Sequence, residues 1–186
     1  MIEHAPKGTF TGIHPPLGEA GDGNCVIVQE LGSDPTLRSN QEIVDFLLAD
    51  ERLRPLPLFV SGSIAKEIAR RKAENPSLPI GPVVLAFEGP SADNRHENLG
   101  TYGELAQYRA VTYLHPREYD KPVLVTSGYN VGNVVRQAGL LDIDVIVPAR
   151  LPRSFDWRSK QLWTKAWPLW ALTSHWRIHR LKRHGH

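Results

Sequence analysis

The chain has 186 residues, of which 41% are hydrophobic and 23% charged, and its formal net charge is +2. This length and composition are typical of one globular domain with a single sizeable core. No run approaches the roughly 20 apolar residues that span a bilayer, and residues 1–23 lack the charged start and apolar centre of a signal peptide. We therefore expect a cytoplasmic protein.

A single cysteine, Cys25, lies within an apolar run. An intrachain disulfide is excluded, and the thiol is expected to behave as a small core hydrophobe. The sequence predicts no metal site and identifies no cofactor. Residues 1–24, rich in Gly, Pro and His without periodicity, are expected to form an irregular arm before one domain that covers residues 25–186.

Five short, β-rich runs alternate with amphipathic stretches along that domain. The expected strands are Cys25–Gln29, Leu58–Val60, Val83–Phe87, Val123–Thr126 and Ile143–Val147. The expected helices are Asn40–Asp50, Ile64–Glu74, Asn98–Tyr113 and Val131–Ala138. Apolar strands separated by helices indicate an α/β fold with a doubly wound, mostly parallel five-stranded sheet, Rossmann-like and in three layers.

Small and polar residues follow the expected strands, where an open parallel sheet collects its ligands. The turns are Glu30-Leu31-Gly32-Ser33, Ser61-Gly62-Ser63, Glu88-Gly89-Pro90-Ser91 and Ser127-Gly128-Tyr129-Asn130. Such turns bring backbone N–H groups and helix N-termini towards a ligand, an arrangement that suits phosphate or carboxylate. Gly and Ser also form ordinary strand-to-helix turns. The argument for an anionic ligand is therefore that such turns recur in several loops.

Several of these residues resemble the signature segments of the ElyC/SanA/YdcF family of bacterial proteins. Leu31-Gly32, Arg38 and the Ser61-Gly62-Ser63 turn resemble its first-strand Leu-Gly, its Arg before the first helix and its Ser-Gly-Gly turn. Glu88, Ser91, Glu97 and Asn98 are similar to a Glu-x-x-Ser segment that leads to Thr-x-Glu-Asn, and residues Thr126 to Asn130 are similar to a Thr-Ser-x-x-His segment.

This resemblance implies a Rossmann-like fold, a nucleotide-like ligand and a role in cell-envelope metabolism, without naming a reaction. The ligand-binding residues expected on this basis are Gly32, Arg38, Ser61, Gly62, Ser63, Glu88, Ser91, Glu97, Asn98, Thr126, Ser127, Tyr129 and Asn130. The chain departs from the family pattern where Ser63 replaces Gly, Asn130 replaces His and Asn133 replaces Arg. Asparagine does not titrate, so catalysis is the property that these departures question.

Three residues are candidates for chemistry: Glu88, His96 and Asn130. Glu88 leaves a buried strand directly and needs a partner, either Arg38 in a structural ion pair or a ligand hydroxyl. His96 is either a proton carrier beside Ser91 or a solvated loop histidine. Whether the protein is an enzyme stays open, and a non-catalytic binding or scaffolding module is the alternative.

The tail is basic and rich in tryptophan. Residues 150–186 carry nine Lys/Arg against one Asp/Glu, and all five tryptophans fall after residue 156. Trp163, Trp167 and Trp170 share one helical face, although Pro168 interrupts it, and packing of a final helix on the sheet is the first interpretation. The alternative is a membrane-surface contact through residues 157–186, while nucleic acid is disfavoured by the acidic body and the lack of an RNA-binding motif.

Overall fold

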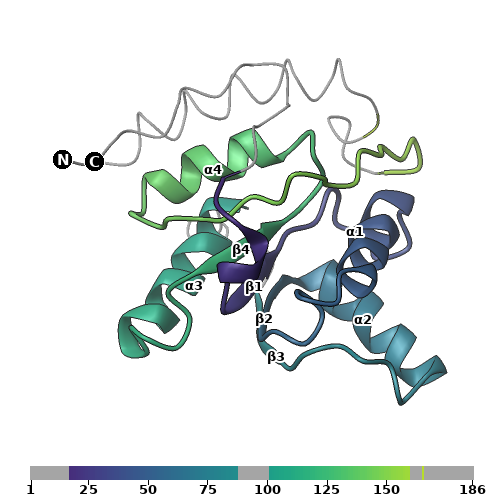
Figure 1. Cartoon of the computed structure of the whole chain (residues 1–186). Coiled ribbons are helices and arrows are strands. Elements are labelled where there is room, and N and C mark those ends of the chain that lie inside the picture. The colour runs from purple at the N-terminus through teal and green to yellow at the C-terminus, as the bar shows by residue number, and fades with distance from the viewer. Residues whose placement is uncertain (1–16, 88–100, 160–164, 166–186) are drawn as a thin grey trace, which may run out of the picture.

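The computed structural model describes residues 17–87, 101–159 and 165 of the chain (Figure 1). The expectations for Glu88, Ser91, His96, Glu97 and Asn98 lie outside the described residues. The same holds for the arm before residue 17 and for every tryptophan except Trp157, whose side chain is exposed.

The described residues form four strands and four α-helices that alternate along the chain. They are β1 (Cys25–Val28), α1 (Arg38–Ala49), β2 (Leu58–Ser61), α2 (Gly62–Glu74), β3 (Val83–Phe87), α3 (Thr101–Leu114), β4 (Pro122–Val125) and α4 (Val131–Gly139), after a short 3-10 turn at Ala20–Asp22. This alternation confirms the α/β prediction. The expected helix at Asn40–Asp50 begins two residues earlier, at Arg38.

All strand pairs are parallel, and the sheet order is β3-β2-β1-β4. Val26 of β1 lies opposite Leu58 on one side and Val123 on the other. The chain winds outward from β1 through β2 to β3 and then returns to the other side of β1. The winding direction therefore reverses between β1 and β4, the place where open α/β sheets bind their ligands.

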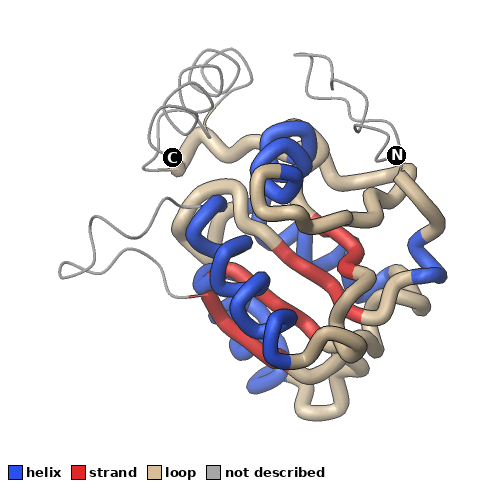
Figure 2. The backbone as a smooth tube through the Cα atoms, turned by 90° about the vertical axis from the view of Figure 1, so that its left-hand side faces the viewer, coloured by secondary structure: helices blue, strands red, loops and turns tan. Residues whose placement is uncertain are grey.

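Helices cover both faces of this sheet because β1, β2 and β4 are apolar on both sides. Val26 and Val28 belong to a core cluster with residues of α1 and α2, whereas Cys25 and Ile27 pack with residues of α3 and α4. Figures 1 and 2 show the two helix pairs on opposite sides of the strands. Every residue of β1 is buried, as its unbroken apolar sequence requires.

The fifth expected strand, Ile143–Val147, joins the sheet only through isolated bridges. Ile146 pairs in parallel with Val123, its N–H donates to the Pro122 carbonyl at 2.9 Å, and its carbonyl accepts the Leu124 N–H at 2.8 Å. Val147 pairs antiparallel with Leu17. The segment therefore lies along the free edge of β4 without forming a regular strand among the described residues.

A set of ion pairs around a buried carboxylate of α2 links this helix to α1. Glu67 has a side chain only 1% exposed and accepts hydrogen bonds from Arg70 at 2.8 Å and Arg71 at 2.7 Å. Arg71 also reaches Asp45 of α1 at 2.5 Å. Burial alone would raise the pKa of Glu67, but the two guanidinium groups outweigh it and hold that pKa below its ordinary value.

The described helices are short, and α3, the longest, has 14 residues. No helix in these parts of the chain has both the length and the apolar character to cross a membrane.

Candidate functional site

The loops after β1, β2 and β4 lie at one edge of the sheet, because the three strands are parallel and adjacent. This edge holds most of the residues that the sequence singled out and that the structure describes. They are Gly32, Arg38, Ser61, Gly62, Ser63, Thr126, Ser127, Tyr129 and Asn130.

The β1–α1 loop is held from the inside by two buried side chains of α1. The Asn40 amide accepts the Leu31 N–H at 2.9 Å and donates to the carbonyls of Gly32 at 2.8 Å and Asp34 at 2.9 Å. The Ser39 hydroxyl donates to the Leu31 carbonyl at 2.9 Å. Gly32 adopts a φ of 96°, which L side chains rarely adopt, so this loop has one defined shape.

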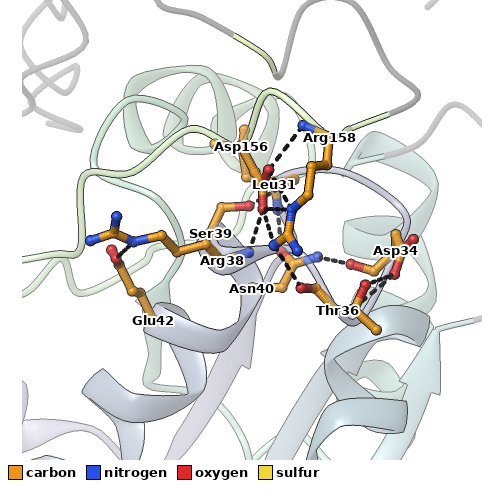
Figure 3. Close-up of polar contacts among 9 residues, drawn as sticks. All are labelled: Leu31, Asp34, Thr36, Arg38, Ser39, Asn40, Glu42, Asp156 and Arg158. Carbon is orange, nitrogen blue, oxygen red and sulfur yellow. Dashed lines mark hydrogen bonds and ion pairs between the residues drawn. The ribbon is translucent and has the colours of Figure 1, made fainter.

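The N-terminus of α1 is occupied by a carboxylate from much later in the chain. The Arg38 N–H donates to Oδ2 of the buried Asp156 at 2.8 Å, and Arg158 donates to the same carboxylate and to the Thr36 carbonyl (Figure 3). The Arg38 side chain, 74% exposed, points away and pairs with Glu42 at 2.6 Å. The anion position expected at this helix terminus is therefore filled by the protein itself.

The N-terminus of α2 has its own internal carboxylate, Glu30, which follows β1. Its Oε2 accepts the Ser63 N–H at 3.2 Å and a short hydrogen bond from the Ser63 hydroxyl. Burial raises the pKa of Glu30, and the Ser63 contacts and the nearby Lys66 charge oppose that rise. The Glu30 N–H donates to Ser61 Oγ at 3.3 Å.

A second carboxyl group, Glu104 in the first turn of α3, also contacts Ser61. The Ser61 hydroxyl is hydrogen-bonded to Glu104, and Gln29 Nε2 donates to Glu104 Oε2 at 3.0 Å. Burial and the negative charge of Glu30 raise the pKa of Glu104 to about 7, while the Ser61 hydrogen bond opposes the rise. This edge therefore holds two carboxyl groups whose pKa values burial raises.

A chain of buried amides runs from β4 into α4. Asn130 Nδ2 donates to Thr126 Oγ1 at 3.5 Å, Asn133 Nδ2 to Asn130 Oδ1 at 3.3 Å, and Gln137 Nε2 to Asn133 Oδ1 at 2.9 Å. All four side chains are buried. Asn130 and Asn133, which both depart from the family pattern, are thus partners in one network that contains no titrating group.

Three buried polar atoms in the described part of the chain find no hydrogen-bond partner: Gln29 Oε1, Ser127 Oγ and Gln137 Oε1. Gln29 directly follows β1, and Ser127 is the second residue after β4; the winding reverses between these two strands. Buried polar groups are almost always satisfied by protein, water or ligand. The unpaired atoms of Gln29 and Ser127 are therefore candidate partners for a bound molecule or an ordered water.

Residues 148–159 connect the two loops that flank this point. The Gly128 N–H donates to the Pro152 carbonyl at 2.7 Å, and the Tyr129 ring stacks on Phe155 with a centroid distance of 4.6 Å. A Cβ on Gly128 would lie 3.0 Å from the Arg153 side chain, which would then have to shift by a few tenths of an ångström. In Figure 1 the segment runs past α4 and ends above α1, where Asp156 caps the helix.

The sequence reasoning did not name Gln29, Glu104 or Asp156 as site residues, and it mentioned Glu30 only as part of a turn. One signal was present: Thr101 and Glu104 have the Ser/Thr-x-x-Glu spacing of a helix start, which places Glu104 in a first turn. Glu30 follows an apolar strand in the same way as Glu88. No short pattern marks Asp156, because its partner Arg38 lies 118 residues earlier.

The described residues contain no cluster of three or more His, Cys, Asp or Glu side chains suited to a metal ion. Comparison of the chain with protein-family models, curated proteins and solved structures finds no match in any of the three. The site is therefore interpreted from its own geometry, and the family resemblance depends on the quoted segments alone.

Proposed function

We propose that this chain is an ElyC/SanA/YdcF-like protein that binds an anionic, nucleotide-like or phosphorylated small molecule at the carboxyl ends of β1, β2 and β4. The observation that carries the proposal is the pair of unpaired buried atoms, Gln29 Oε1 and Ser127 Oγ, at the point where the sheet reverses its winding. A bound molecule would supply the hydrogen bonds that these atoms lack.

An exposed cation at the same edge supports the anionic character of the ligand. Arg153 touches the β4–α4 loop and its side chain is exposed, whereas the Arg38 side chain points away and pairs with Glu42. The N-termini of α1 and α2 already bind Asp156 and Glu30, so they favour negative charge without being free for a ligand. The ligand phosphate would therefore meet Arg153 and the β4–α4 loop.

Thermal melting of the full chain with a panel of anions tests this function. The panel contains inorganic phosphate, pyrophosphate, adenosine monophosphate and hexose phosphates, with the parent nucleoside and sugars as neutral controls. A ligand at 100 times its dissociation constant stabilises the fold by about 2.7 kcal/mol, which raises the melting temperature by several degrees.

Ser127→Ala sharpens the test, because it removes a buried hydroxyl that has no partner in the described residues. We expect the variant to fold with unchanged or slightly higher stability and to lose part of the ligand-induced shift. Ser77→Ala is the matched control, since Ser77 is exposed and follows α2 at the opposite edge of the sheet. Equal shifts in both variants, or shifts with the neutral controls alone, would contradict the proposed site.

A non-catalytic binding or scaffolding module is the second candidate, and a specific observation favours it. The network of Asn130 and Asn133 has no titrating group, and the Asp156 cap makes the β1–α1 loop a structural element. A ligand that raises the melting temperature and is recovered unchanged after long incubation would support the module over an enzyme.

The proposal includes a fold of five strands and three layers, with Ile143–Val147 as the edge strand beside β4. The hydrogen bonds of Ile146 to Pro122 and Leu124 support this register.

We also propose a cytoplasmic location, with a role in cell-envelope metabolism and a membrane-surface contact through residues 157–186.

A further inference from the structure

We propose that the N-terminus of α4, the buried Ser127 hydroxyl and the Arg153 guanidinium form a subsite for a phosphate monoester. This inference rests on the proposed function and deepens it, because it names the charged group of the ligand and the protein groups that hold it. The N-termini of α1 and α2 already hold the carboxylates of Asp156 and Glu30, whereas no side chain caps α4.

The first turn that leads into α4 begins at Ser127, whose hydroxyl is unused. The Ser127 carbonyl accepts the N–H of Asn130 at 2.7 Å and that of Val131 at 3.2 Å. A serine at the start of a helix normally accepts a backbone N–H two or three residues further on. Ser127 Oγ instead has no partner among the described residues, although the residue is only 1% exposed. Because Oγ lies one bond beyond Cβ, the unpaired hydroxyl stays beside this turn.

Backbone donors and open space lie at the same turn. Among the described residues, no backbone carbonyl accepts the N–H of Tyr129 or Gly132. The Asn130 side chain does not cap the turn, because it is hydrogen-bonded to Thr126 and Asn133. A Cβ built on Gly132 would meet no described atom within 4 Å. Side chains in a helix lean towards its N-terminus, so this space is open at the end where the donors lie.

Arg153 brings a full positive charge to this terminus. The Gly128 N–H donates to the Pro152 carbonyl at 2.7 Å, and a Cβ built on Gly128 would lie 3.3 Å from Arg153 Nε. The Arg153 side chain is exposed and forms no ion pair with any residue that the structure describes. The positive end of a helix dipole repels a cation, and an anion between the two relieves that repulsion. The arrangement therefore favours a bound anion.

A phosphate monoester matches these groups better than a carboxylate or a diester. It has three terminal oxygens and a charge of about −1.5 to −2 near pH 7. The Ser127 hydroxyl, two backbone N–H groups and the Arg153 guanidinium supply a donor for each oxygen. A diester or a carboxylate offers only two such oxygens and a single charge, so it leaves part of the donor set unpaired.

The first experiment compares adenosine monophosphate, a monoester, with cyclic adenosine monophosphate, a diester of the same nucleoside, by calorimetry on the full chain. We expect the monoester to bind about tenfold more tightly, the ratio that one hydrogen bond to a charged group is worth. Arg153→Gln should remove most of this preference, and Arg153→Lys should restore part of it. Arg117→Gln is the matched control, because Arg117 is exposed and precedes β4 at the opposite edge of the sheet. Equal binding of the two nucleotides, or equal effects of Arg153→Gln and Arg117→Gln, overturns the subsite while the proposed function stands.

The second experiment locates the phosphate by following backbone amide NMR signals of the full chain as inorganic phosphate is added. We expect the amides of Tyr129 and Gly132 to shift most. Gly132→Leu should fill the open space and abolish the response, while Gly139→Leu, at the other end of α4 where a Cβ also meets no described atom, should keep it. Both variants should melt at or above the wild-type temperature, because glycine is unfavourable in a helix. Largest shifts in the β1–α1 loop overturn the subsite alone, and no response to phosphate or to either nucleotide contradicts the proposed function as well.

Discussion

Asp156 caps the helix that begins at Arg38, 118 residues earlier in the chain, with 2.8 Å between the Arg38 nitrogen and Asp156 Oδ2. Hydrogen bonds from Arg158 to Asp156 fix the carboxylate in that position and, with the Arg38 N–H, hold its pKa well below the ordinary value for aspartate. This side chain helps to hold residues 148–159 across the carboxyl-end edge of the sheet.

Asp156→Ala should therefore destabilise the protein by about 1 to 2 kcal/mol, the usual cost of losing a helix cap. Chemical denaturation at pH 7 measures the difference in the free energy of unfolding. Asp144→Ala is the control, because Asp144 is exposed and lies close in sequence without capping a helix. A loss equal in the two variants would mean that the cap contributes nothing.

Asp156 should also make the free energy of unfolding depend on pH, and a variant of this residue isolates its contribution. A lowered folded pKa contributes stability that is present above the unfolded value of about 3.9 and is lost as the pH falls below it. The stability difference between wild type and Asp156→Asn should accordingly shrink between pH 5 and pH 2. A difference that stays constant over this range would contradict the role of the charge.

β1, β2 and β4 were predictable because burial on both faces leaves an apolar signature that needs no tertiary knowledge. Residues Cys25 to Val28 are apolar throughout and are buried throughout. Ile143–Val147 looked equally strand-like, yet Asp142 and Asp144 are exposed and Pro148 lacks an N–H, so the segment makes only bridges in the structure. At the edge of a sheet, a segment is under less constraint to form a regular strand than a segment at the centre.

The site was predictable only in part, because its chemistry depends on which strand ends become neighbours. The Ser61 turn could be placed at the carboxyl-end edge of the sheet from its position after a strand. The raised pKa of Glu104 arises from burial and from the charge of Glu30, 74 residues away in sequence. It could not be predicted from the sequence, because it depends on β1 and β2 being neighbours and on where α3 lies. Arg38 was expected to face the ligand, whereas its side chain pairs with Glu42 along the helix.

Cys25 should be unreactive in the native protein. It is fully buried beside Tyr108, and burial raises the pKa of its thiol to about 12, so almost no thiolate is present at pH 8. Tyr108→Phe removes a hydrogen bond to the Tyr119 carbonyl, which should cost about 1 kcal/mol and speed alkylation by iodoacetamide several-fold. Tyr113→Phe, at an 80% exposed position, should leave the rate unchanged. Rapid labelling of the native wild type would contradict the buried position.

Asn130 and Asn133 should behave as one unit in a double-mutant cycle. Each alanine substitution alone breaks the amide chain and leaves buried partners unpaired, so the second substitution costs less than the first. The coupling free energy from denaturation should be roughly 0.5 kcal/mol or more. Asn40, which holds the β1–α1 loop and shares no hydrogen-bond partner with this network, should combine with Asn133→Ala additively. Additivity in both pairs would mean that the network is not cooperative.

Glu104 should make the protein less stable as the pH rises through neutrality. A carboxyl group whose folded pKa is raised to about 7 favours the fold in its neutral form, and this contribution is fully present below the unfolded value of about 4.3 and is lost between that pH and about 8. Each pKa unit corresponds to about 1.4 kcal/mol, so the total loss should be about 1 to 3 kcal/mol, reduced by the partial exposure of the side chain.

Glu104→Gln removes the titrating group while keeping a similar shape, and it should be more stable than wild type at pH 8 and close to it at pH 5. Glu51→Gln should show no such pH-dependent gain, since that carboxyl group is exposed. Denaturant unfolding of the three proteins at both pH values gives the comparison, and parallel stability curves for wild type and Glu104→Gln would show that Glu104 is ionised in the fold from pH 5 upward.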